Sequence, residues 1–152
     1  MKKSYIGAIP NPHIRDFQRK KLYYAEALCP FWNKIEPISK YRVKKLVKDI
    51  SSWANITPPT ISYATTIKNG RVAFATKDDL VLPFPLSRSI PFICHEMSHV
   101  INYQIGPADH HGSNFASAYL EVVHTFMGQT EYEELLNSFN QLKVKHKEVI
   151  HI

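Results

Sequence analysis

The sequence holds only two cysteines, Cys29 and Cys94, and they are too far apart to form a C-x-x-C pair. Two cysteines exclude a disulfide framework, so a hydrophobic core has to hold the fold together. A chain of 152 residues is long enough to bury such a core in one domain but not in two. The sequence also has no internal repeat, low-complexity tract or linker. We therefore expect a single domain over residues 1–152.

Long apolar runs are missing as well. No stretch is long and apolar enough to span a membrane. Met1-Lys2-Lys3 is a possible start of a signal peptide, but the chain then runs into Pro10, Pro12 and Arg15 without an apolar segment. We therefore expect no export by this route and a cytoplasmic location.

Acidic residues are scarce in residues 1–50, which hold twelve Lys or Arg against four Asp or Glu. The basic residues gather in Arg19-Lys20-Lys21 and in Lys44-Lys45 with Lys48. A basic face can attract nucleic acid. The same residues alternate with apolar ones at helical spacing, which fits the solvated faces of two ordinary helices. We favour the second interpretation, because the sequence has no recognisable nucleic-acid-binding motif. Nucleic acid is a weak candidate partner.

The most informative segment is Pro91-Phe92-Ile93-Cys94-His95-Glu96-Met97-Ser98-His99-Val100-Ile101, which contains an H-E-x-x-H motif. Residues four apart on a helix project from one face, so His95 and His99 can share one Zn²⁺. Glu96 then lies beside the metal, where a carboxylate can take a proton from a zinc-bound water. The apolar flanks indicate a helix buried on most sides. We expect Cys94 to pack in the core, because adjacent helical residues point about 100° apart.

A third ligand is expected downstream, because catalytic zinc uses three protein ligands and one open position. Gly106-Pro107 predicts the end of the motif helix and a turn. Two further histidines, His110 and His111, stand in that turn. Gly112 follows them, and its lack of a side chain would let the backbone approach the site closely.

His95-Glu96-x-x-His99 followed by His111-Gly112-x-x-Phe115 resembles the SprT-like and related minimal zincin metallopeptidases, over about residues 87 to 128. It is also similar to small uncharacterised bacterial and phage metallohydrolases. The resemblance implies that His95, His99 and His111 bind one zinc ion and that Glu96 is the general base of peptide hydrolysis. The larger SprT-like proteins often add a cysteine-rich zinc ribbon, and this chain has none.

Hydrolysis of an amide also needs a hydrogen-bond donor, besides zinc, for the developing oxyanion. The candidates in the sequence are Tyr103, His110 and Tyr119. Each of them also fits a packed aromatic or a loop histidine, and the sequence does not rank them. Asp109, and again His110, are candidates for a group that orients a ligand imidazole.

The remaining pattern predicts an α+β fold, with a small antiparallel sheet packed on helices and the motif on a central helix. The N-terminal helical part is expected at about 15–53, the sheet at 60–84, the zinc helices at 90–127 and a C-terminal helix at 131–144. Within the sheet we predict strands at 61–67, 71–76 and 80–84, because Lys68-Asn69-Gly70 is a strong hairpin signal. Ser89 is the predicted N-cap of the motif helix, and Thr130 with Glu133 predicts a capping box for the last one.

These features favour a zinc metallopeptidase that acts on protein or peptide. A zinc amidase that cuts a non-protein amide, such as a cell-wall peptide, would use the same ligands. A third alternative is a non-catalytic, zinc-stabilised domain that binds nucleic acid. Glu96 speaks against this third alternative, because structural zinc is usually closed by four protein ligands and has no use for a free carboxylate.

Overall fold

The computed structural model describes residues 16–63 and 73–147. Its α+β class confirms the class predicted from the sequence. The elements of the described residues are α1 (Arg19–Leu28), η2 (Pro30–Lys34), α2 (Lys40–Ala54), β1 (Thr60–Ser62), β2 (Phe74–Ala75), β3 (Asp79–Val81), η3 (Pro85–Arg88), α3 (Ile90–Ile105), α4 (Ser113–Phe126) and α5 (Gln129–Gln141).

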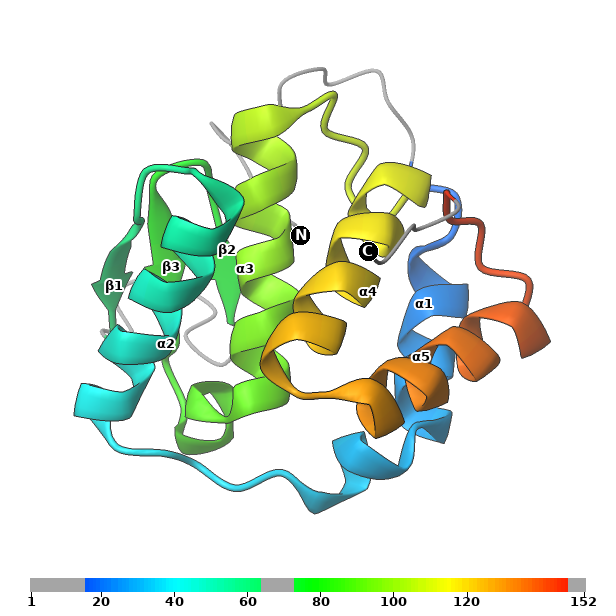
Figure 1. Ribbon diagram of the computed structural model, residues 1–152, viewed down its shortest axis with the longest axis horizontal. Helices are drawn as coiled ribbons and strands as arrows, with labels where there is room; N and C mark the ends of the chain where they lie inside the picture. Colours follow the sequence, from blue (N-terminus) through cyan, green and yellow to red (C-terminus); the bar gives the residue numbers. More distant parts are fainter. Residues whose placement is uncertain (1–15, 64–72, 148–152) are drawn as a thin grey trace.

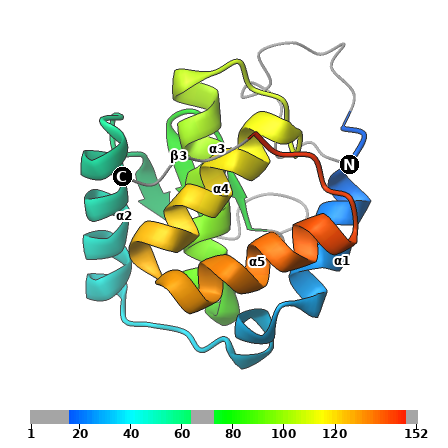
Figure 2. The same cartoon turned by 45° about the vertical axis from the view of Figure 1, so that its right-hand side comes forward.

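The motif helix α3 runs through the middle of the molecule (Figure 1). Helix α2 and the sheet lie on one side of it, and α4, α5 and α1 lie on the other, as the second view also shows (Figure 2). α3 packs directly against α4, α2, β2 and β3, whereas α1 packs against α5. Buried side chains from all five of these helices and from β2 and β3 form one hydrophobic cluster. The predicted central place of the motif helix is therefore correct.

The sheet is mixed, so the prediction of an antiparallel sheet was wrong for one strand. β3 is the middle strand; it pairs parallel with β1, where Thr60 lies opposite Asp79, and antiparallel with β2, where Ala75 lies opposite Leu80. The predicted turn Lys68-Asn69-Gly70 lies outside the described residues. β1 and β2, which were expected to pair with each other, lie on opposite sides of β3. A turn signal predicts only that two neighbouring strands pair, and it does not predict which strands lie on either side of β3. Leu80 in this middle strand is completely buried.

Ser89 is the N-cap residue of α3, as predicted, but its side chain makes no capping hydrogen bond. The Ser39 hydroxyl accepts a hydrogen bond from the backbone N–H of Arg42 at the start of α2, and α3 ends at Gly106, whose φ is 61°. The predicted capping box at Thr130 was wrong, because α5 begins two residues earlier, with Gly128 as its N-cap. The N–H of Gly128 also donates to the carbonyl of Val123 in α4. One glycine thus ends α4 and starts α5.

Both cysteines are buried free thiols, and the burial of Cys94 confirms the prediction from the sequence. Burial raises the pKa of Cys94 to about 12 and that of Cys29 to about 11. The Cys29 thiol also donates to the hydroxyl of Ser138 at 3.3 Å. None of the described helices is long and apolar enough to cross a membrane.

Candidate metal centre

Three histidines meet inside the protein, two from α3 and one from the loop between α3 and α4. His95, His99 and His111 are buried, and each offers a ring nitrogen that lies within 4.8 Å of the other two. Nε2 of His99 lies 3.2 Å from Nε2 of His111. Two nitrogens that bind one tetrahedral zinc, each at 2.0–2.1 Å, are about 3.3 Å apart. The cluster therefore fits one metal ion, and the part of the chain described by the structure holds no second cluster of this kind.

Two carboxylates fix the orientation of the imidazoles of His95 and His111. Nδ1 of His95 lies 2.5 Å from a carboxylate oxygen of Glu26, and Nδ1 of His111 lies 2.8 Å from a carboxylate oxygen of Asp16. A carboxylate accepts the Nδ1–H proton, which leaves the Nε2 lone pair of the same ring available for a metal. Burial lowers the pKa of His111 and lowers that of His99 further. Both of these rings are therefore neutral at neutral pH, as a metal ligand must be.

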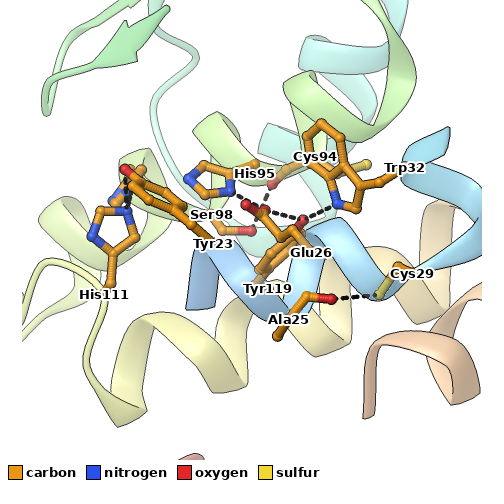
Figure 3. Close-up of polar contacts among 11 residues, drawn as sticks. Tyr23, Ala25, Glu26, Cys29, Trp32, Cys94, His95, Ser98, His111 and Tyr119 are labelled. Carbon is orange, nitrogen blue, oxygen red and sulfur yellow. Dashed lines mark hydrogen bonds and ion pairs between the residues drawn. The ribbon is translucent and has the colours of Figure 1, made fainter. Parts of the chain in front are cut away.

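Glu26 is itself held by a chain of hydrogen bonds (Figure 3). The hydroxyl of Tyr119 donates to Glu26 at 2.6 Å, and the indole N–H of Trp32 donates to the oxygen of Tyr119 at 2.9 Å. Tyr119 is completely buried. It was a candidate for oxyanion stabilisation, but its hydroxyl donates to Glu26. Tyr119 therefore affects His95 only through Glu26.

The loop that carries the third histidine is held by Asp109. Its carboxylate accepts hydrogen bonds from the backbone N–H of Asn114 at 2.8 Å and of Phe115 at 3.1 Å, so it caps the start of α4. Asp109 was expected to orient the imidazole of a metal ligand, but these partners are backbone N–H groups. Gly112 does permit a close approach, and the group that approaches it is the Asp109 carboxylate. A Cβ on Gly112 would lie 2.6 Å from Oδ2 of Asp109. His110 has a left-handed backbone, with φ of 60°, and does not belong to the histidine cluster.

Two polar atoms close to the cluster have no hydrogen-bond partner among the described residues. They are Oε1 of Glu96 and the hydroxyl oxygen of Tyr103, and both are buried. Glu96 is only 5% exposed, and burial raises its pKa to about 7, against the opposing effect of His95. The ring of Tyr103 stacks beside that of His99. A buried polar group without a partner costs about 1–3 kcal/mol, so such atoms mark places where a bound group belongs.

Aromatic side chains pack around the cluster. Phe115, the phenylalanine of the His111-Gly112-x-x-Phe115 segment, stacks on the ring of His99 with the ring centroids 4.1 Å apart. Tyr23 of α1 also contacts the cluster, and its hydroxyl oxygen is 3.4 Å from Nε2 of His111. Burial, together with the charges of Glu96 and Glu26, raises the pKa of Tyr23, so the phenol keeps its proton at neutral pH.

Sequence reasoning thus found the three clustered histidines and Glu96 but missed Glu26, Asp16 and Tyr23. One signal was present for Glu26. It is an acid on the same helix face as Leu22 and Ala25, which are both completely buried. A carboxylate on the buried face of a helix needs a partner.

Comparison with known proteins gives no relative, since no family model, curated protein or solved structure matches this chain. The resemblance to SprT-like metallopeptidases therefore rests on the two histidine segments alone.

Proposed function

We propose that this chain is a zinc-dependent metallopeptidase whose metal is held by His95, His99 and His111. The observation that carries the proposal is the combination of three converging imidazoles with the buried, unpaired carboxylate oxygen of Glu96 on the same helix. A purely structural zinc site would supply a fourth protein ligand, whereas the cluster found among the described residues consists of three histidines only.

When bound, zinc would acidify a water molecule and polarise the carbonyl of the substrate. Glu96 accepts the proton of the attacking water and passes it to the leaving amine. Glu96 directly follows His95 on α3, so its carboxylate would lie beside the metal without being a ligand. Glu26 and Asp16, which contact Nδ1 of His95 and of His111, would leave the Nε2 atoms of these two rings available to the metal.

The test is the variant Glu96→Gln, which keeps the size of the side chain and removes its basicity. We expect zinc content and thermal stability to be retained, while the rate of peptide hydrolysis falls about 10²- to 10⁴-fold. Glu36→Gln is the matched control, because Glu36 is exposed and lies in the connection between η2 and α2. An active preparation that keeps its full rate after Glu96→Gln would show that Glu96 is not the base.

A zinc amidase acting on a non-protein amide remains the alternative within the same chemistry, since the ligands and Glu96 would serve it equally. Parallel assays on a denatured protein and on a peptidoglycan fragment separate the two. Hydrolysis of the fragment alone would favour the amidase.

The non-catalytic alternative needs one basic face that binds nucleic acid. The residues concerned are Arg19, Lys20, Lys21, Lys44, Lys45 and Lys48. They fall on α1 and α2, which lie on opposite sides of α3 in both views (Figures 1 and 2). We therefore expect weak, non-specific binding of DNA and no effect of DNA on hydrolysis. A tight, salt-sensitive complex that is lost when these six charges are neutralised would support the alternative.

A further inference from the structure

Three tyrosines lie against the histidine cluster, and they differ in what their hydroxyl groups are free to do. Tyr119 is completely buried and donates to Glu26. The hydroxyl of Tyr103 is buried beside His99. Tyr23 is 43% exposed, and its hydroxyl oxygen lies 3.4 Å from Nε2 of His111. Among the three, Tyr23 thus combines an exposed side chain with a hydroxyl that lies next to a nitrogen of the histidine cluster.

Helix α1 directs Tyr23 and Glu26 to the same cluster. The two residues are three positions apart, which places them on one helical face. Glu26 contacts His95 through its carboxylate, and the ring of Tyr23 stacks beside His95 with the centroids 6.2 Å apart. The same tyrosine ring meets the ring of His111 edge-on at 5.1 Å (Figure 3). α1 thus supplies both the carboxylate that contacts His95 and a phenol beside the His95 ring.

The contact between Tyr23 and His111 depends on a lone pair that a metal would use. Asp16 accepts the proton on Nδ1 of His111, so Nε2 of this ring is the acceptor for the phenol. The distance of 3.4 Å is long for a hydrogen bond to a hydroxyl, so the phenol is only weakly committed to it. A metal on Nε2 would occupy this lone pair. The phenol would then be available to an oxygen atom bound to the metal.

We propose that Tyr23 is a catalytic residue whose phenol donates a hydrogen bond to the carbonyl oxygen of the scissile amide as negative charge develops on it. This assignment rests on the proposed hydrolytic function. A donor placed in advance at that position stabilises the transition state more than the ground state, so it acts on kcat rather than on KM.

The first test is Tyr23→Phe, with Tyr24→Phe as the matched control. Both variants remove one phenolic oxygen from neighbouring positions of α1, and Tyr24 is 66% exposed. We expect Tyr23→Phe to keep its zinc and to lose roughly 10²-fold in kcat, with KM little changed. Tyr24→Phe should match the unaltered protein. An equal loss in both variants, or a loss in Tyr103→Phe but not in Tyr23→Phe, would overturn the assignment.

A second test does not depend on hydrolysis. The protein is loaded with Co²⁺ and titrated with acetohydroxamate, a small chelator that binds the metal through its carbonyl oxygen and its N–O oxygen, and binding is followed by visible absorption. We expect Tyr23→Phe to weaken acetohydroxamate binding roughly threefold to tenfold, the loss of one hydrogen bond, with Co²⁺ affinity unchanged. Tyr24→Phe should bind it normally.

The two tests separate the assignment from the function on which it rests. Weakened acetohydroxamate binding in a protein that hydrolyses no peptide would support the position of the phenol and reject the peptidase. Unchanged acetohydroxamate binding in Tyr23→Phe, in a protein that does hydrolyse peptides, would reject Tyr23 and leave the peptidase standing. Loss of the metal itself in Tyr23→Phe would overturn the assignment, because the phenol would then serve metal binding.

Discussion

A carboxylate oxygen of Glu26 on α1 lies 2.5 Å from Nδ1 of His95 on α3, although the two residues are 69 positions apart in the sequence. Asp16, just before α1, makes the same contact with His111 over 95 positions. The candidate metal ligands come from α3 and the loop after it, whereas both groups that orient them come from the N-terminal part of the chain. α1 is therefore part of the candidate site and not only part of the core.

Replacing Glu26 tests this relationship. Glu26→Ala should weaken zinc binding by about 10- to 100-fold, because His95 loses the partner that fixes its tautomer and its orientation. The metal-free variant should also unfold more easily, by about 1–3 kcal/mol, since the hydroxyl of Tyr119 loses its acceptor. Competition with a calibrated chelator measures the first effect, and denaturant unfolding measures the second.

The variant Glu36→Ala removes an exposed carboxylate and should change neither quantity. If Glu26→Ala bound zinc as tightly as the unaltered protein, the carboxylate would have no role in orienting His95.

The contact between Gly112 and Asp109 predicts a coupled pair of substitutions. Gly112 has φ of −77°, which any residue adopts, so Gly112→Ala is penalised only by the collision with Asp109. We expect a loss of about 1–2 kcal/mol in the free energy of unfolding, since displacement of the Asp109 carboxylate uncaps α4. In a chain that already carries Asp109→Ala, the same glycine substitution should cost little. Additive losses in this double-mutant cycle would contradict the proposed collision.

The cysteines provide a prediction about pH. Burial raises the pKa of Cys29 to about 11 and that of Cys94 to about 12, so both thiols stay protonated well above pH 8. Because only the thiolate reacts, a disulfide reagent at pH 8 should label neither cysteine of the folded protein at an appreciable rate. Both should react at once in denaturant. Rapid labelling of the folded protein would show that one thiol is more exposed and more acidic than described.

Local patterns were enough to predict the helices and the core of the candidate site. Spacing of four placed His95 and His99 on one face of α3, and Gly106 marked the end of that helix. The histidine of the next turn, His111, joined them as the resemblance implied. These predictions depend on residues within about 20 positions of one another, where helix geometry and turn chemistry decide the outcome.

Contacts between distant segments could not be predicted in this way. The positions of Glu26 and Tyr23 relative to His95 depend on how α1 packs against the rest of the molecule, and no periodicity encodes that packing. The parallel pairing of β1 with β3 is of the same kind, because it joins two segments that a local turn signal does not link. Asp109 was misjudged for a related reason, as its partners became visible only when the path of the loop was known.

The most direct test of the account is the metal content of the protein, measured by mass spectrometry after purification without added metal. We predict about one zinc per chain in the unaltered protein, and its loss in the double variant of His95→Ala and His99→Ala. His146→Ala should keep it, because His146 lies in the C-terminal segment and contacts Asn140 instead. Full retention of zinc by the double variant would contradict the central claim.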